Sequence, residues 1–454
     1  MKINHYNTYP YGGAANAAKR IHDGLCEQGQ DSSFYYRIDN RQTNEVLNDP
    51  RLFQIQYQTQ AQAKTRGFDL LGPIRKRAEK KRVQQIHRLY DFHIRPRTNS
   101  EHEVYSMARL PETTQLDWVG KHKSDIVHLH WLAHMVDFTS FFDSIPNEVP
   151  IVWTMHDMGA ITGGCHYSDD CMAFESGCGN CPQVANSNAR DVSYDSMQAK
   201  QKSLHGKKLH IVAPSKWLIE LAKRSVVWPA ETTFSVLHYG LDLELFQPQD
   251  QTAVRQRLGI ETKKTVIGFG ADDLSNRRKG FGFLCDALKQ LTGNTPGQLP
   301  IELVVFGEGE IPDDLQDQFQ THSFGYVREP SRLADVYACC DMVVVPSLQD
   351  NQPQVGLEAM ACGRPVVGFD AGGIPEYTID GETGRLAPAR DTDALSTAIR
   401  WMVDNPQAVC DFGRQAREKM EKEFEVTRQT RAYVELYRSL VNLSCVKNSM
   451  CKAS

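Results

Sequence analysis

The feature that most constrains this chain is a pattern of short β-rich runs alternating with helical segments, which occurs once and then restarts. The first series includes strands at Ile3–Asn7, 125–130 and 149–155, and the second includes 264–270, 301–307 and 341–346. Alternation of this kind is typical of parallel sheets covered by helices on both faces. With 454 residues, the chain is also too long for one ordinary hydrophobic core. The sequence therefore predicts an α/β fold of two doubly wound, Rossmann-like domains facing each other across a cleft.

We place the amino-terminal domain at residues 1–245, the carboxyl-terminal domain at 246–424, and a final helix at 425–454 that packs back on the first domain. Hydrophobic residues make up 41% of the chain and the formal net charge is −5, which excludes a disordered chain and binding to nucleic acid through bulk positive charge. The start, MKINHYNTYPYGG, has no apolar signal core, so we expect a cytoplasmic protein.

Residues 66–97 depart from this acidic balance. They contain ten Lys or Arg against three acidic residues, a local net charge of +7, with apolar residues at intervals between them. The segment could rest on anionic lipid headgroups at the inner face of the membrane, or it could be a solvated helix face. The sequence leaves both readings open.

The strongest chemical signal is the run from Pro346 to Glu376. Asp350 and Glu358 are separated by seven residues across a junction of loop and helix. Backbone N–H groups at the start of that helix, including those of Gln354 and Val355, favour an anion, and Glu358 further along suits a vicinal diol. A phosphate and a diol at the carboxyl end of a parallel strand describe a nucleotide site.

A second patch follows the first strand of the second series. In Arg277-Arg278-Lys279-Gly280, the cations of Arg278 and Lys279 suit a diphosphate whose negative charge grows as it leaves. Gly12-Gly13 opens the first helix of the chain and permits close approach of backbone to a ligand. His156 ends a strand on the side where α/β sheets bind ligands, and His128 and His130 end another.

Together these motifs resemble the retaining nucleotide-sugar-dependent glycosyltransferases of family 4, which have the GT-B fold. The resemblance covers nearly the whole chain, and its centre is the match of Asp350 to Val367 to an acidic residue, seven residues and Glu-Ala-Met-Ala-Cys-Gly-x-Pro-Val-Val. The family more often has Glu where this chain has Asp350. An Arg common in the family's phosphate loop is absent upstream of Lys279, and we assign its part to Arg278.

The resemblance implies a hexosyltransferase that moves a sugar, with retention, from a nucleoside-diphosphate sugar to a saccharide or lipid-linked saccharide in surface polysaccharide synthesis. Asp350, His156 and Lys279 would serve catalysis, and no cofactor would be required. Donor contacts would come from Gly12, Gly13, Arg278, Lys279, Gln354, Val355 and Glu358. Two alternatives are a nucleotide-sugar epimerase of GT-B fold and a non-catalytic scaffold that kept the fold.

Four of the twelve cysteines crowd together after the His156 strand, within residues 165–181. Their spacing could surround one tetrahedral Zn²⁺ ion of a structural kind. Paired disulfides and free thiols are the alternatives, and the resembled family includes members with a similar cysteine-rich insert. The four are Cys165, Cys171, Cys178 and Cys181.

Overall fold

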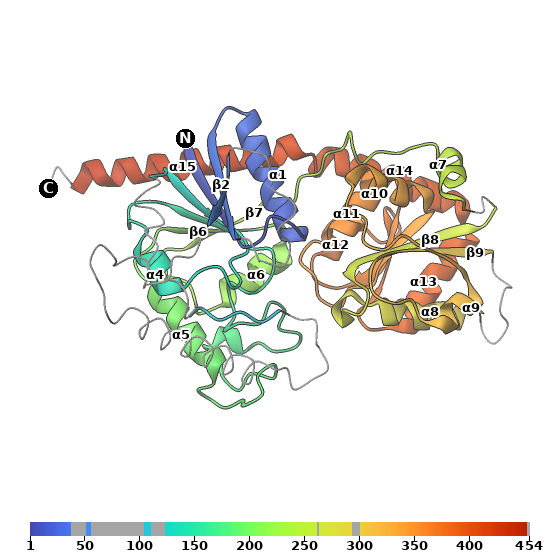
Figure 1. Cartoon of the computed structure of the whole chain (residues 1–454), viewed down its shortest axis with the longest axis horizontal. Helices are drawn as coiled ribbons and strands as arrows, with labels where there is room; N and C mark the ends of the chain where they lie inside the picture. The colour runs from blue at the N-terminus through green and yellow to red at the C-terminus, as the bar shows by residue number, and fades with distance from the viewer. Residues whose placement is uncertain (38–50, 56–103, 110–122, 261–262, 293–299, 452–454) are drawn as a thin grey trace, which may run out of the picture. The chain divides into compact units, whose positions relative to one another are not determined.

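A computed structural model describes residues 1–37, 51–55, 104–109, 123–260, 263–292 and 300–451. The basic segment 66–97 lies outside the described residues. The chain divides into two compact units. Unit 1 comprises residues 1–214, 218–237 and 430–454, and unit 2 comprises 215–217 and 238–429. Both are parallel sheets with helices packed on their faces (Figure 1), so the predicted pair of doubly wound α/β domains is confirmed.

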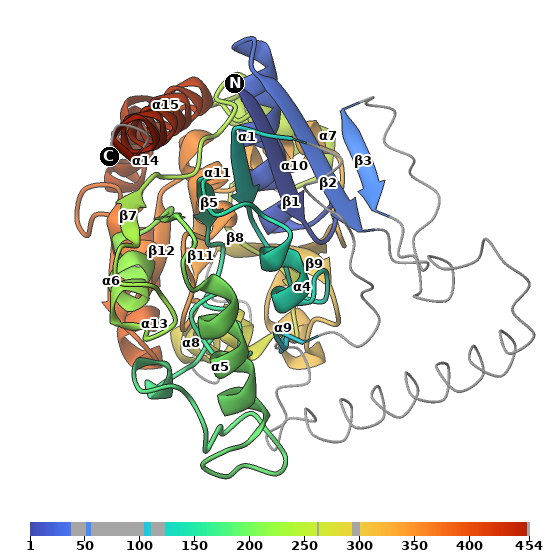
Figure 2. The same cartoon turned by 90° about the vertical axis from the view of Figure 1, so that its left-hand side faces the viewer.

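Unit 1 is built on a seven-stranded parallel sheet of order β3-β2-β1-β4-β5-β6-β7. Strands β1, β2 and β3 lie side by side in Figure 2. The strands are β1 (Lys2–Asn7), β2 (Asp31–Arg37), β3 (Leu52–Ile55), β4 (Ile126–Leu129), β5 (Ile151–Thr154), β6 (Leu209–Ala213) and β7 (Thr233–Val236). Its helices are α1 (Gly13–Glu27), α4 (Phe138–Asp143), α5 (Val192–Leu204), α6 (Lys216–Arg224) and most of α15 (Val426–Cys451), with a short 3₁₀ turn at Ala173–Glu175.

Unit 2 is built on a six-stranded parallel sheet of order β10-β9-β8-β11-β12-β13. The strands are β8 (Thr265–Asp273), β9 (Ile301–Glu308), β10 (Gln320–Ser323), β11 (Met342–Val345), β12 (Val366–Asp370) and β13 (Gly384–Pro388). The helices are α7 (Gln251–Leu258), α8 (Phe281–Thr292), α9 (Asp313–Gln318), α10 (Pro330–Cys339), α11 (Gln354–Ala361), α12 (Ile374–Tyr377), α13 (Thr392–Asp404) and α14 (Pro406–Glu423), with a 3₁₀ turn at Arg277–Lys279.

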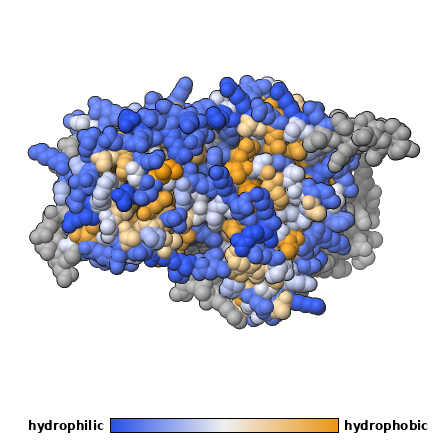
Figure 3. Space-filling view, turned by 180° about the vertical axis from the view of Figure 1, so that it is seen from behind, coloured by the Kyte–Doolittle hydropathy of each residue, from blue (hydrophilic) through white to orange (hydrophobic). Residues whose placement is uncertain are grey.

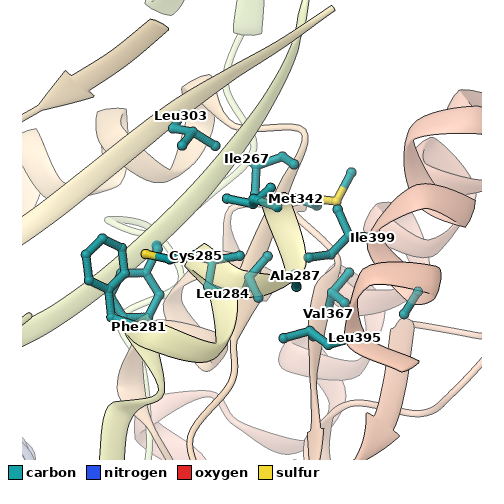
Figure 4. Packing of buried hydrophobic residues seen from close by; sticks show 14 of the residues in the cluster. Ile267, Phe281, Leu284, Cys285, Ala287, Leu303, Met342, Val367, Leu395 and Ile399 are labelled. Atoms are coloured by element: carbon teal, nitrogen blue, oxygen red, sulfur yellow. The ribbon is translucent and has the colours of Figure 1, made fainter. Parts of the chain in front are cut away.

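Burial explains why these segments form these elements. All four residues of β11, Met-Val-Val-Val, are buried, as expected for a central parallel strand covered on both faces. On one face of the sheet, α8 and α13 contribute Leu284, Leu288, Leu395 and Ile399 to a single core cluster with the strands (Figure 4). Asp391 starts α13 by accepting a hydrogen bond from the Ala394 amide, a side-chain cap.

The core of unit 1 is completed by residues from late in the chain. Tyr433, Val434 and Tyr437 of α15 are buried in one cluster with residues of β1, α1, β4, β5 and β6. The Tyr433 hydroxyl lies 2.8 Å from Thr154 Oγ1, and the Tyr437 hydroxyl lies 2.7 Å from His128 Nδ1. The core beside this sheet is therefore completed by three residues, Tyr433, Val434 and Tyr437, that come after the end of unit 2 in the sequence.

Candidate active site

In each sheet the strand order reverses direction once, and the predicted site residues follow the strands on either side of that point. In unit 2 the reversal lies between β8 and β11; Lys279 follows the first and Asp350 the second. In unit 1 it lies between β1 and β4; Gly12 follows the first and His130 the second. Ligands of open α/β sheets bind at this switch point, outside the carboxyl ends of the strands.

Asp350 is the centre of the unit 2 cluster. One carboxylate oxygen, Oδ2, accepts hydrogen bonds from Lys279 Nζ at 2.7 Å and from an Arg278 guanidinium nitrogen at 3.2 Å. The other, Oδ1, accepts one from the Asn351 amide at 3.0 Å. Three residues that the sequence singled out, from two loops 71 residues apart, are thus brought together. Two cations against one carboxylate leave a net positive charge here.

Burial alone would raise the pKa of Asp350, but Lys279 and Arg278 overcome that effect and hold it below its ordinary value of 3.8. Asp350 is therefore ionised at neutral pH although its side chain is almost fully buried.

Glycines let the backbone close around Asp350. A Cβ on Gly280, which has φ of +80°, would lie 1.8 Å from the Pro346 carbonyl oxygen. One on Gly372, with φ of +59°, would lie 2.0 Å from the carbonyl oxygen of Asp350 itself. Any larger residue at these positions would push apart the loops that carry the cations and the carboxylate.

Glu358 is buried in α11, and its Oε2 accepts a hydrogen bond from the Tyr337 hydroxyl of α10 at 3.0 Å. Tyr337 is a residue that sequence reasoning missed, because no motif marks it. The first turn of α11, which contains Gln354 and Val355, is half-buried. Its N-cap, Pro353, has no side-chain cap within the described part of the chain, so these amides suit an anion.

In unit 1, Gly12 is the N-cap of α1 with φ of +90°, a backbone conformation that only glycine adopts without strain. A Cβ built on Gly12 meets no atom of the described residues within 4 Å, which leaves space for a ligand beside this turn as far as those residues extend. Gly13 is the first residue of α1.

His156 belongs to a chain of buried histidines. Its Nε2 lies 3.2 Å from His130 Nδ1, and His130 Nε2 lies 3.0 Å from His5 Nδ1. The parallel register that pairs His5 of β1 with His128 of β4 brings these strands' imidazoles together. His5 is a further residue that sequence reasoning missed, although a polar residue in a buried strand was a usable signal.

Burial lowers the pKa of all of these imidazoles, that of His156 to about 4 despite the opposing effect of Asp157. The pKa of His130 falls well below 6.5 through burial and then through the neighbouring histidines. Each ring is therefore neutral at pH 7 and acts as one hydrogen-bond donor and one acceptor. His128 bonds to Thr154 and Tyr437 within the core, a structural position.

Beside His156 lies a pocket with a second polar network. His166 Nδ1 lies 2.6 Å from Asp157 Oδ2, and His166 Nε2 lies 2.8 Å from Ser106 Oγ. The Trp131 indole N–H donates to the same Asp157 oxygen at 2.7 Å. Lys200 also lines this pocket, but its ammonium is held by the carbonyl oxygens of Gly159 and Thr162. None of these contacts was foreseen from the sequence.

The four loop cysteines also converge. Cys165, Cys171, Cys178 and Cys181 all line one small pocket of unit 1, and all four are free thiols. Burial raises the pKa of Cys178 to about 11, so this thiol is neutral at pH 7 unless a cation is present. The described residues contain no disulfide among these four.

Solved structures share this architecture over almost the whole chain. Sucrose-phosphate synthase from Thermosynechococcus elongatus aligns with a TM-score of 0.65 and 19% identity, covering 98% of this chain and 100% of that one. HepE from Anabaena in complex with UDP aligns with a TM-score of 0.63 and 18% identity, covering 97% and 100%. These likenesses show that the fold is GT-B.

The sequence comparisons then point to one group of enzymes. Residues 263–405 match the family described as "Glycosyl transferases group 1". D-inositol 3-phosphate glycosyltransferase 2 from Catenulispora acidiphila is 29% identical over 196 residues, 40% of this chain and 45% of that protein. A D-inositol 3-phosphate glycosyltransferase from Saccharomonospora viridis is 32% identical over 212 residues, 44% and 48%. The chain thus matches about half the length of these curated relatives, and the comparisons support a group 1 glycosyltransferase.

The described part of the chain contains no helix long and apolar enough to cross a membrane. On the face drawn in Figure 3, hydrophilic residues predominate and hydrophobic ones form smaller patches between them.

Proposed function

We propose that this protein is a retaining glycosyltransferase that moves a sugar from a nucleoside-diphosphate sugar to a hydroxyl of a saccharide or lipid-linked saccharide. The observation that carries this proposal is the cluster of Lys279, Arg278 and Asp350 at the switch point of unit 2. A net positive charge at the carboxyl end of parallel strands, beside a helix start without a side-chain cap, is suited to a diphosphate.

Unit 2 would hold the donor. Glu358, oriented by Tyr337, would accept hydrogen bonds from the two ribose hydroxyls, which requires a buried acceptor with a fixed direction. Gln354 and Val355 would offer the first amides of α11 to phosphate oxygens. By the family resemblance, Gly12 and Gly13 would contact the donor through their backbone, and the space beside Gly12 would allow such a contact.

In the chemical step, the bond between the anomeric carbon and the phosphate oxygen breaks while the acceptor oxygen bonds to that carbon on the same face. The proton of the acceptor hydroxyl passes to the leaving diphosphate oxygen, and the nucleoside diphosphate is released. Lys279 and Arg278 would stabilise the negative charge that develops on the diphosphate. Asp350 would lie by the sugar and keep both cations in place, since it bonds to each of them.

Unit 1 would hold the acceptor and touch the transferred sugar through neutral groups. His156, whose pKa burial lowers to about 4, is neutral at pH 7 and would contact hydroxyl groups of the sugar without adding charge. The neighbouring pocket is lined by Trp131, His166 and Ser106 together with Asp157 and Lys200, so it offers several polar groups that could orient a saccharide.

The curated relatives suggest a second acceptor class, because their names specify D-inositol 3-phosphate. A cation in this pocket would stabilise a phosphate-bearing acceptor. Among the described residues that line it, Lys200 is the one Lys or Arg, and two carbonyl oxygens already hold its ammonium. Within the described residues, the lining therefore offers less to a phosphate than to an uncharged saccharide, and we propose the saccharide acceptor, in surface polysaccharide synthesis.

The test is ligand-observed NMR of the purified protein with UDP-, GDP- and ADP-sugars, without acceptor. We expect one donor to bind the wild type, and Glu358→Gln to weaken its binding about 10- to 100-fold, the cost of a charge-assisted hydrogen bond pair. Glu418→Gln, an exposed glutamate of α14, is the matched control. Absence of binding to every donor would contradict the proposal.

The same samples, given mono- and oligosaccharides and then inositol phosphates, distinguish the acceptors. A product whose new glycosidic bond has the donor's anomeric configuration supports retention. An inverted configuration, or an epimerised nucleotide sugar formed without acceptor, would overturn the mechanism.

A further inference from the structure

The cysteine loop, residues 165–181, gathers its four thiols around one pocket of unit 1. Nine other residues line this pocket (Tyr105, Thr162, Gly163, Gly164, Ser168, Ala173, Phe174, Gly179 and Ser193). Among the lining residues that the structure describes, none is a histidine or a carboxylate. The potential ligand atoms at this place are therefore sulfur, a donor set that selects thiophilic metals over Mg²⁺ or Ca²⁺.

The backbone at the end of the loop adopts a left-handed conformation that is uncommon for residues other than glycine. Four consecutive residues have positive φ: Gly177 (109°), Cys178 (64°), Gly179 (97°) and Asn180 (49°). Two of them are not glycine, and such residues adopt positive φ at a cost of about 1 kcal/mol each. This left-handed turn places Cys178 and Cys181 on the same pocket, as a Cys-x₂-Cys metal knuckle requires.

Hydrogen bonds fix this turn before any ligand enters. The Cys181 amide donates to Asp191 Oδ2 at 2.8 Å, and the Gly179 amide donates to Ser193 Oγ at 2.9 Å, both at the start of α5. The Gly163 amide donates to Cys178 Sγ at 3.1 Å. An amide N–H aimed at sulfur stabilises a thiolate, and thiolates are the form in which cysteine binds metal.

We propose that Cys165, Cys171, Cys178 and Cys181 bind one Zn²⁺ ion as a tetrahedral four-thiolate site. Zinc bonded to four sulfurs at about 2.3 Å sets the sulfurs about 3.8 Å apart. Within the described residues, three potential ligand atoms lie within 4.8 Å of one another only in the His5, His128 and His130 group. No three of the four cysteine sulfurs therefore lie within 4.8 Å of one another, and binding would require the sulfurs to move closer together.

With four protein ligands the ion has no open position, so it stabilises the loop and takes no part in chemistry. Its effect on the candidate active site passes through His166, the residue after Cys165, which bonds to both Asp157 and Ser106. Holding Cys165 holds the backbone from which His166 reaches that pocket. This inference does not depend on which sugar or acceptor the enzyme uses.

Metal content is measured first, on the full chain expressed in zinc-supplemented medium and passed over a weak chelating resin. Inductively coupled plasma mass spectrometry should give about one zinc per chain. Cys178→Ser should lower that to less than about a tenth, since three thiolates bind far more weakly than four. Cys26→Ser, a half-buried cysteine of α1 in the same unit, should leave zinc content unchanged.

A second measurement does not depend on the variant folding. Co²⁺ replaces the metal in wild-type protein after denaturation with chelator and refolding. We expect the intense d–d bands of a tetrahedral site together with thiolate-to-cobalt charge transfer. Alkylation of the denatured protein without reductant, followed by peptide mapping, should show Cys165, Cys171, Cys178 and Cys181 in reduced form.

Wild-type protein without zinc or any other metal, with no tetrahedral Co²⁺ spectrum, overturns the proposal. Loop peptides recovered as disulfides, each two hydrogen atoms lighter than the reduced pair, overturn it as well. Donor binding by NMR separates this failure from that of the proposed function, because Arg278, Lys279 and Glu358, which carry the proposed donor site, lie in unit 2 and the cysteine loop lies in unit 1.

Discussion

The two candidate sites are built on equivalent places in two similar sheets, yet they differ in charge. In unit 2, Asp350 is a buried ion held by Lys279 and Arg278. In unit 1, His156, His130 and His5 are buried and bonded to each other, and burial keeps them neutral. The first arrangement suits a ligand that carries charge, and the second suits one that carries hydroxyl groups. Under the proposed function, one architecture would serve a nucleoside diphosphate in one unit and a sugar in the other, and the two units would differ for this purpose in their side chains.

The largest expected difference between the units is in their response to acid. Burial lowers the pKa of six unit 1 histidines: His5, His128, His130, His134, His156 and His210. In the unfolded chain each takes up a proton near pH 6.5, but in the folded chain it does so only at lower pH. Stability of unit 1 is therefore full above about pH 6.5 and falls below it, by about 1.4 kcal/mol per histidine and per pH unit.

The Asp350 pKa is lowered from 3.8, so its contribution to unit 2 stability is full above about pH 4 and is lost as pH falls through the folded value.

Urea unfolding at pH 7 and pH 5.5, followed by pulse proteolysis with fragments assigned by mass spectrometry, measures the stability of each unit separately. Unit 1 should lose most of its stability at pH 5.5 and unit 2 little. Equal losses of stability in the two units would contradict the expected difference in their response to acid.

Lys279→Ala should have the largest effect on activity. It removes a cation from the developing charge of the leaving group, and we expect kcat/KM for sugar transfer to fall about 10²- to 10³-fold. Lys289→Ala, at an exposed ion pair with Asp314 in the same unit, is the control and should change kcat/KM less than twofold. A fall of less than threefold for Lys279→Ala would show that charge at this site does not serve catalysis.

His156→Asn should lower kcat/KM less, by about tenfold, because a neutral hydrogen bond is worth about 0.5–1.5 kcal/mol. Since the pKa of His156 is about 4, the wild-type rate should show no inflection from this residue between pH 5.5 and 8. His205→Asn, at an exposed position after α5, is the matched control. An inflection near pH 6.5 that His156→Asn removes would mean that this imidazole titrates as a catalytic acid or base.

The smallest effect is expected for Tyr337→Phe, which removes the hydrogen bond to Glu358 and should weaken donor binding about two- to tenfold. Tyr377→Phe is a close control, since Tyr377 is also fully buried in unit 2 and its hydroxyl has no hydrogen-bond partner within the described residues. Isothermal titration calorimetry with the nucleotide measures both. Equal effects of the two variants would mean that Tyr337 only packs and does not orient Glu358.

Most of the sheet framework could be predicted from the sequence, because buried parallel strands are short apolar runs that end in glycine or polar residues. Strands β1, β4, β5, β8, β9 and β11 lie where that pattern indicates. Strand β10, Gln-Thr-His-Ser, was missed because it is an exposed strand at the sheet edge and contains no apolar residue. Helices α5, α6, α13 and α14 were also not foreseen.

The candidate site of unit 2 was predictable to the extent that its residues sit within two recognisable motifs, 277–280 and 346–376. Asp350, Glu358, Lys279 and Arg278 are marked by spacing and by neighbouring glycines. The histidine chain was not, because it depends on strand register: His5 and His128 are 123 residues apart in the chain and become neighbours only when β1 pairs with β4. The contact of His166 with Asp157 likewise requires the path of the cysteine loop.

The position of Tyr433 and Tyr437 in the core of unit 1 affects how the protein is made. A ribosome delivers β1 to β7 early, but the two tyrosines emerge only after all of unit 2. Until then the apolar residues of β1, α1 and β6 that contact α15 remain uncovered, and the hydroxyl of Thr154 lacks Tyr433. The unit translated first is therefore the last to complete its core, and a nascent chain stalled before residue 430 exposes a surface for chaperones.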